Sequence, residues 1–246
     1  ELEKRVTKDI FSVKGGFGNL IKALAEGIGY ENIALNEKCK IVSDEGSYVR
    51  LSISSGEIQA KKVISTVGAH AIKDLFKSTP PSFETMNYAK VVQVAVGVKS
   101  DKSIDTKAFG LLIPAVEKRH SLGVLFPSAC FNGRAPKGKV LLSCFLGGIN
   151  NPGILEKSDS ELIQIVKNEL NAIYHLSESD IEFIELFRHT HAIPQYEICC
   201  EAIWSDIAAF EKQHPMVILA GNTRDGIGIP NRIKQAFDLV DNIHLA

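Results

Sequence analysis

The segment HPMVILAGNTRDGIGIPNRI, residues 214–233, predicts a buried strand, a polar loop and a helix in that order. Gly226 and Gly228 flank Ile227 in the loop, and Pro230 then opens the helix. Proline suits the first helical position, where its missing N–H has no cost. The glycines remove side-chain bulk in front of bare main-chain amides, so a flat polar ring with negative charge can approach them. On this segment alone, an ordinary strand-to-helix loop is the alternative.

A second glycine-rich segment, GGFGNLIKAL at residues 15–24, resembles a dinucleotide phosphate loop. The fingerprint requires a third glycine, but Ile21 stands at that place, although Glu37 is close to the expected acidic position. We therefore interpret the glycines as a turn that enters a helix over residues 17–28.

Composition narrows the function class. The 246 residues carry a formal charge of −1 and are 45% hydrophobic, which is typical of one large or two small globular domains. A balanced charge argues against nucleic acid or an anionic membrane as a partner and favours a small molecule. Five scattered cysteines indicate a reducing compartment and not a disulfide framework.

The first 84 residues predict local elements before a boundary. Residues 29–42 are expected to form a strand, and residues 49–67 a hairpin with a turn at Ser54–Glu57. TPPSFE at 79–84 is the predicted boundary, because two prolines should forbid a helix there.

The region after the boundary is predicted to be rich in strands. Four apolar segments separated by Gly and Pro favour an antiparallel sheet, at residues 90–99, 109–118, 121–130 and 139–148. Ser158 and Glu161 then form a capping box before a helix. A strand over 181–189 and a helix over 197–213 precede the closing segment.

This order predicts a mixed α/β (α+β) fold in which the C-terminus returns to complete the first domain. We expect a discontinuous domain of residues 1–79 and 214–246, and a sheet-rich domain of residues 80–213.

At this point the chain resembles a known family. GNTRDGIGIPNRI is similar to the C-terminal flavin-contact motif of protoporphyrinogen oxidases, within the flavin amine oxidase superfamily. Further motifs occur in the family's order along nearly the whole chain: KGGFGNLIKALAEGI, KKVISTVGAHAI, FGLLIP, LGVLF, RAP, CFLGGI and HAIPQY.

The resemblance implies a partial FAD-binding domain of the flavin amine oxidase type and an antiparallel-sheet substrate-binding domain. It implies FAD as cofactor and oxidation of protoporphyrinogen IX to protoporphyrin IX, with oxygen taking the electrons and forming hydrogen peroxide. Carried over by motif, the cofactor contacts are Cys39 (through main-chain atoms), Ile227, Gly228 and Ile229, and the substrate-gripping residues are Leu112, Leu125 and Phe145. It assigns no catalytic side chain, since the cofactor accepts the hydride.

The sequence departs from the family pattern at its start, where the nucleotide-binding Rossmann unit and an upstream arginine for a propionate are lacking. We therefore expect a C-terminal portion of the enzyme that is inactive alone and binds FAD weakly or not at all. Purified protein with nearly stoichiometric flavin absorbance would refute that expectation.

The resemblance leaves alternatives open. They are coproporphyrinogen III oxidation to coproporphyrin III, and a non-catalytic porphyrin-binding module. We expect a cytoplasmic protein, with a homodimer and a peripheral contact at the inner face of the cell membrane left open.

Two further residue groups were considered as sites. His189 and His191 share a strand face, but no third ligand has metal-like spacing, so a polar strand end is the favoured interpretation. Arg119 and Arg134 are candidates for propionate contacts, although surface salt bridges are the favoured alternative.

Overall fold

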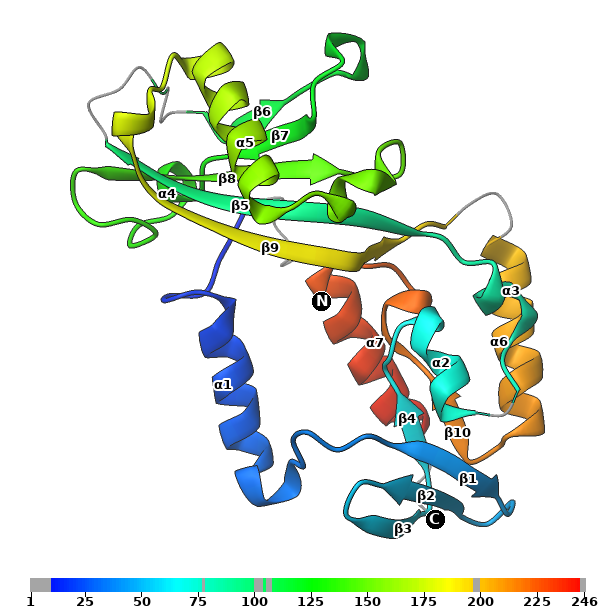
Figure 1. The fold of residues 1–246 in the computed structure, drawn as a ribbon. Coiled ribbons are helices and arrows are strands. Elements are labelled where there is room, and N and C mark those ends of the chain that lie inside the picture. The colour runs from blue at the N-terminus through cyan, green and yellow to red at the C-terminus, as the bar shows by residue number, and fades with distance from the viewer. Residues whose placement is uncertain (1–9, 77, 100–103, 105–107, 197–199, 244–246) are drawn as a thin grey trace. The chain divides into compact units, whose positions relative to one another are not determined.

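The structure, a computed structural model, divides into two compact units (Figure 1). Unit 1 comprises residues 1–35 and 91–189, and unit 2 comprises residues 36–90 and 190–246. The described residues are 10–76, 78–99, 104, 108–196 and 200–243.

Unit 1 is built around the predicted sheet, which has five strands in the order β6-β7-β8-β5-β9. The pairs β5–β8, β6–β7 and β7–β8 are antiparallel, which confirms the predicted pairing mode. Along β5, alternate side chains are buried, as expected for a strand with one face on a core. The strands are β5 (Tyr88–Lys99), β6 (Gly110–Leu112), β7 (Ser121–Leu125), β8 (Lys139–Gly147) and β9 (Ile181–Pro194).

Helix α5 (Asp159–Tyr174) covers one face of this sheet (Figure 1). Its capping box is present as predicted, because Ser158 accepts from the Glu161 N–H and Glu161 accepts from the Ser158 N–H. Leu162 and Leu170 on its inner side are fully buried in the core of unit 1.

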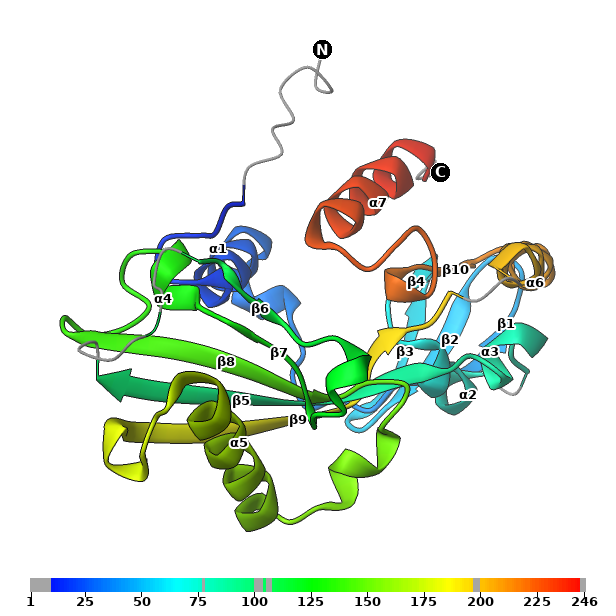
Figure 2. The same cartoon turned by 90° about the horizontal axis from the view of Figure 1, so that it is seen from above.

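Helix α1 (Phe17–Ile28) lies on the other side of the sheet from α5 (Figures 1 and 2). Gly16 precedes it with φ +103°, so the glycines form the predicted helix-entry turn. Residues 10–13 are not in a strand, which removes the context that a dinucleotide loop requires.

Unit 2 contains two small sheets. The hairpin is confirmed, but its second half forms two strands in different sheets instead of one strand reaching residue 67. β1 (Lys40–Asp44), β2 (Val49–Ile53) and β3 (Gly56–Ala60) are antiparallel, whereas β4 (Val63–Ser65) pairs in parallel with β10 (Val217–Leu219).

Four helices accompany these strands, and most of their buried side chains join one apolar cluster with Val217 and Leu219. The helices are α2 (Ala69–Leu75), α3 (Pro81–Glu84), α6 (Cys200–Gln213) and α7 (Ile229–Asn242). The predicted start of α6 at residues 197–199 lies outside the described residues.

Two sequence predictions in unit 2 or next to it were wrong. The prolines at the predicted boundary do not forbid a helix. Pro80 precedes α3 and Pro81 is its first residue, where proline needs no N–H partner. Most of residues 29–42 is not a strand, because Gly29 adopts φ +87° and a helical turn follows at once. The short turns are η2 (Tyr30–Asn32), η3 (Ala115–Glu117), α4 (Pro127–Cys130), η4 (Pro152–Glu156), η5 (Glu178–Asp180) and η6 (Gly221–Thr223).

The units are bounded at different residues from the predicted domains. The N-terminal segment joins unit 1, where the Arg134 guanidinium donates to Ser12 Oγ and to the Val13 carbonyl. Helix α6 joins unit 2, where Asp206 accepts from the Ser82 N–H at 2.8 Å. The roles of the units, flavin binding and substrate binding, stay predictions.

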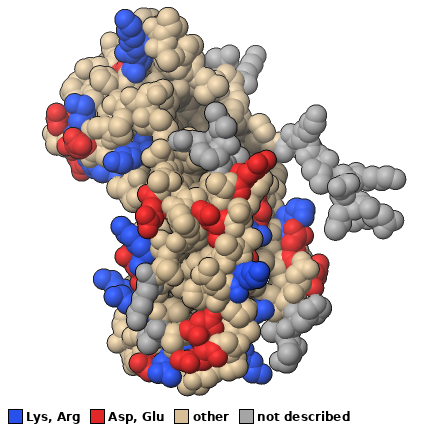
Figure 3. All heavy atoms as spheres, turned by 90° about the vertical axis from the view of Figure 1, so that its right-hand side faces the viewer, with Lys and Arg blue, Asp and Glu red and all other residues tan. Residues whose placement is uncertain are grey.

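Charges of both signs are interspersed on the face shown in Figure 3. None of the helices in the described part of the chain has the length and apolar character that crossing a bilayer requires.

Candidate functional site

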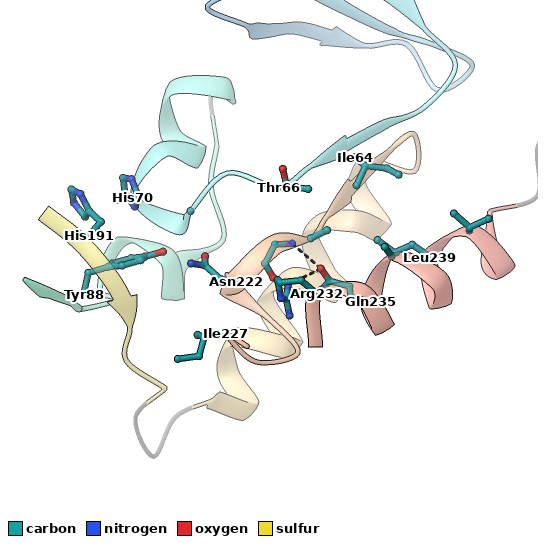
Figure 4. Close-up of a pocket in the computed structure, with 15 residues that line it drawn as sticks. Ile64, Thr66, His70, Tyr88, His191, Asn222, Ile227, Arg232, Gln235 and Leu239 are labelled. Carbon is teal, nitrogen blue, oxygen red and sulfur yellow. Dashed lines mark hydrogen bonds between the residues drawn. The ribbon is translucent and has the colours of Figure 1, made fainter. Parts of the chain in front are cut away.

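A pocket of about 610 Å³ lies in unit 2 (Figure 4), within the usual size range of small-molecule sites. Its walls come from β4, α2, the ends of β5 and β9, the loop after β10, and α7. The lining is mostly apolar and also contains the polar side chains of Thr66, His70, Tyr88, His191, Asn222, Arg232 and Gln235.

The loop after β10 is held by a buried contact at Gly221. This residue adopts φ +85°, and a Cβ there would lie 2.6 Å from the Thr66 carbonyl oxygen. Its N–H donates to Gln235 Oε1 at 2.9 Å, and its carbonyl accepts from Arg232 (Figure 4). Only glycine therefore fits between β4 and α7 at this point.

Gln235 also organises the rest of the loop. Its Nε2 donates to Asp225 Oδ2 at 2.6 Å, and Arg224 Nε donates to the same oxygen at 3.0 Å. Burial raises the pKa of the Asp225 carboxyl, but the hydrogen bond from Gln235 and the Arg224 charge outweigh it, so the net pKa is lowered. The Tyr196 hydroxyl donates to the Asn222 carbonyl at 2.6 Å and fixes the loop from a third side.

The start of α7 carries free main-chain donors. The helix begins at Ile229, one residue earlier than predicted, and Pro230 is therefore its second residue. No side chain caps this helix among the described residues. The first amides and the helix dipole thus favour a negatively charged or electron-rich group at this end.

The predicted cofactor contacts lie at different distances from the pocket. Ile227 lines it and is 47% exposed, whereas Gly228 and Ile229 form the adjoining helix start without lining it. Cys39 precedes β1 and packs against the apolar cluster of unit 2, and burial raises the pKa of its thiol. Cofactor binding by these four residues stays a prediction.

A stacked histidine pair forms one end of the pocket (Figure 4). The rings of His70 and His191 lie 3.7 Å apart at 11°, and Tyr88 meets both edge-on. The Tyr88 hydroxyl accepts from the Ala69 N–H at 2.9 Å, which fixes its ring. Burial and then the neighbouring His191 lower the pKa of His70, and Lys73 adds to this while Asp74 opposes it.

We expect His70 to lower the stability of unit 2 as the pH falls. The folded pKa lies below the ordinary value of 6.5, so the unfolded chain takes up the proton first. Stability present above about pH 6.5 is therefore lost as the pH falls through the folded pKa. NMR titration of the His70 ring should show the lowered pKa, and His191→Asn should raise it again. An unchanged His70 pKa in His191→Asn would contradict the assigned cause.

The three predicted substrate residues share one face of the sheet in unit 1. Leu112 pairs with Gly123, which pairs with Phe145. Leu125 lies two residues after Gly123 and therefore on the same face. Leu112 is 83% exposed, and Leu125 and Phe145 are partly buried, because α5 covers the opposite face. The structure thus brings these residues together, while their binding of substrate stays a prediction.

Both arginines considered for a propionate have partners in the protein. Arg119 Nη1 lies 3.5 Å from Glu169, and Arg134 donates to Ser12 and Val13. The described residues bring together no group of three or more side chains suited to a metal ion.

Sequence reasoning missed the polar residues of the pocket. Gln235 and Arg232 occupy ordinary positions in a helix pattern, and His70 and Tyr88 belong to segments far from His191 in the sequence. The only available signal was the spacing from Gly221 to Gln235, which becomes informative once α7 is known to fold back on the loop.

A solved structure shares this fold. A crystal structure from Exiguobacterium sp. 255-15, whose name, protoporphyrinogen oxidase, is provisional, superposes with a TM-score of 0.85 at 22% identity. The matched region covers 94% of this chain and 51% of the Exiguobacterium chain.

The family model for flavin containing amine oxidoreductases matches residues 2–226, and the chain belongs to this family. The chloroplastic protoporphyrinogen oxidase of Nicotiana tabacum is 23% identical, over 98% of this chain and 47% of its own length. Coproporphyrinogen III oxidase of Bacillus subtilis is 22% identical, over 89% and 48% respectively. The chain thus spans about half the length of these curated relatives.

Proposed function

We propose that the protein takes part in the flavin-dependent oxidation of protoporphyrinogen IX to protoporphyrin IX. The observation that carries the proposal is the shared sheet face of Leu112, Leu125 and Phe145. A porphyrinogen is a wide apolar tetrapyrrole, and such a face holds it by burial, at about 25 cal/mol per Å² of apolar area removed from water. One matched relative is a protoporphyrinogen oxidase and another a coproporphyrinogen III oxidase, which supports a porphyrinogen as the substrate.

The unit 2 pocket fits the flavin of an FAD cofactor. It is mostly apolar, no side chain caps α7 among the described residues, and Arg232 Nε is buried without a hydrogen-bond partner among the described groups. Ile227 would pack on the flavin ring, and the amides of Gly228 and Ile229 would stabilise negative charge on it. The chemistry that bound FAD supplies is acceptance of an electron pair in each of three two-electron steps, with delivery to oxygen to form hydrogen peroxide.

Charge on the sheet face favours protoporphyrinogen over coproporphyrinogen. The neighbours of Leu112 and Phe145 on this face are Gly123, Gln93 and Ser143. The Gln93 side-chain amide donates a hydrogen bond to the Ser143 hydroxyl at 2.8 Å. Coproporphyrinogen carries four propionates and protoporphyrinogen two, so the former needs more cationic partners. This part of the face offers neutral side chains.

Leu112→Asp tests the proposal. We expect it to weaken binding of protoporphyrin IX at least about tenfold, because it replaces an apolar contact by a carboxylate facing propionates. Val116→Asp is the matched control, since Val116 is 80% exposed on η3 and its replacement should leave binding unchanged. Isothermal titration without flavin measures both. Equal affinity of Leu112→Asp and the unmodified chain would contradict the proposal.

Two further arms separate the alternatives. Tighter binding of coproporphyrin III than of protoporphyrin IX would favour the coproporphyrinogen reaction. For turnover, we define a joined protein, in which the part of the Exiguobacterium protein that this chain does not match is linked to residues 1–246. If the joined protein binds FAD and porphyrin but forms no porphyrin from porphyrinogen in air, the non-catalytic module replaces the oxidase. We propose that residues 1–246 alone bind FAD weakly and are inactive.

A further inference from the structure

A hydrogen-bonded polar pair lies on the sheet face that carries Leu112, Leu125 and Phe145. Gln93 on β5 is the register partner of Phe145 on β8, and Ser143 on β8 is the register partner of Leu125 on β7. The strands β5 and β8 are neighbours within the sheet (Figure 2). Because alternate residues of a strand share a face, Gln93 and Ser143 belong to the same face as the three apolar side chains. The pair therefore lies where the proposed substrate would bind.

The serine anchors one end of the glutamine amide. Gln93 Nε2 donates a hydrogen bond to Ser143 Oγ at 2.8 Å. Ser143 is only 5% exposed, whereas Gln93 is partly buried. The buried hydroxyl thus holds the amide nitrogen close to the sheet and fixes the direction in which the amide carbonyl points.

The carbonyl oxygen of this amide is free to accept a hydrogen bond. Gln93 Oε1 has no hydrogen-bond partner among the described residues, and it is not one of their buried oxygens that lack a partner, so it is accessible. Its surroundings are apolar, because Ala95 and Leu125 flank Ser143 and Phe145 flanks Gln93. A polar group within an apolar binding face fixes the orientation of a ligand through the one hydrogen bond that it offers.

The reduced and oxidised forms of the tetrapyrrole differ in the donors that they present to such an oxygen. In a porphyrinogen the bridging carbons are saturated, so the macrocycle is puckered and each pyrrole N–H can turn out of its mean plane. In a porphyrin conjugation flattens the macrocycle, and the remaining N–H groups point in the plane toward its centre. An N–H in the plane does not reach an acceptor above the plane at the angle that a hydrogen bond requires.

We propose that Gln93 is a specificity-determining residue whose Oε1 accepts a hydrogen bond from a pyrrole N–H of the porphyrinogen. The inference rests on the proposed function, because it concerns the substrate of the same sheet face. Oxidation flattens the ring and withdraws the N–H, which leaves the Gln93 carbonyl without a partner beneath the product. The face therefore binds the reduced substrate more tightly than the oxidised product, and this difference favours product release.

Two titrations of residues 1–246 test the role of Gln93. Protoporphyrinogen IX under nitrogen and protoporphyrin IX give two affinities, and the measured quantity is the first divided by the second. This ratio cancels the propionate and apolar contacts that both ligands make. Gln93→Met keeps the length of the side chain and removes the acceptor, so we expect the ratio to fall about fivefold, the effect of one neutral hydrogen bond. Continued binding of protoporphyrin IX shows that the variant is folded.

Three further variants complete the test. Gln93→Glu keeps an acceptor oxygen at the same distance from the main chain and should retain the ratio within about twofold. Ser143→Ala releases the amide from its anchor and should lower the ratio, as Gln93→Met does. Gln164→Met is the matched control, because Gln164 is exposed on α5, which covers the opposite face of the sheet. Its ratio should equal that of the unmodified chain.

The outcomes separate this inference from the proposed function. An unchanged ratio in Gln93→Met and Ser143→Ala, even if both affinities fall together, would overturn the role of Gln93 and leave porphyrinogen binding intact. A fall of the ratio in Gln93→Glu as large as in Gln93→Met would also overturn it, because the acceptor oxygen would then not be the group that matters. Failure of the unmodified chain to bind either tetrapyrrole would overturn the proposed function, and this inference with it.

Discussion

Gly221→Ala is expected to lower the free energy of unfolding of unit 2 by about 3–5 kcal/mol. The added Cβ would lie 2.6 Å from the Thr66 carbonyl oxygen and 3.1 Å from its carbon, and main-chain atoms cannot rotate away. The φ of +85° adds the cost of a left-handed conformation. Separation of β10 from β4 would then lengthen the Ala220–Ser65 hydrogen bond and open the pocket.

Gly46→Ala is the matched control. Gly46 has a similar φ of +76°, but no atom lies within 4 Å of the position that an added Cβ would take, so only the conformational cost of about 1–2 kcal/mol remains. Urea unfolding followed by the fluorescence of Trp204, the single tryptophan of the chain and a residue of α6, reports on unit 2. Similar losses in the two variants would show that the contact with Thr66 does not restrict residue 221.

Gln235→Leu is expected to lower the free energy of unfolding of unit 2 by about 2–4 kcal/mol. The substitution leaves the Gly221 N–H buried without its acceptor and removes one donor to Asp225. The pKa of Asp225 should rise, because burial, the largest effect, raises it and the opposing hydrogen bond from Gln235 disappears. A carboxyl with a lowered folded pKa stabilises the fold above its unfolded pKa and loses this as the pH falls through the folded value. As the pH falls, the stability that the Asp225 carboxylate gives should therefore be lost at a higher pH in the variant than in the unmodified chain.

Gln59→Leu provides the control for this variant. Gln59 is exposed on β3 of the same unit, so its replacement should change stability by less than about 0.5 kcal/mol. Trp204 fluorescence during urea unfolding, repeated at several pH values, compares the two. If both glutamine variants unfold at the same urea concentration, Gln235 does not hold the loop as the hydrogen bonds indicate.

Local sequence patterns predicted the elements whose signals lie within a few residues. Ser158 and Glu161 form the predicted capping box, and the apolar segment 90–99 lies in the predicted strand, β5. The prediction for the two prolines failed, because proline can either break a helix or begin one. Proline at residues 80 and 81 begins α3 instead of preventing it, since the first turn of a helix needs no N–H from proline.

The sequence by itself determined the glycine turn before α1, the strand–loop–helix at the C-terminus, and the family motifs along the chain. Only the tertiary structure decided that Leu112, Leu125 and Phe145 share a face, that His191 stacks on His70, and that β4 pairs with β10. Periodicity records which face of an element is apolar, whereas strand register and contacts between distant segments depend on packing that a local window does not contain.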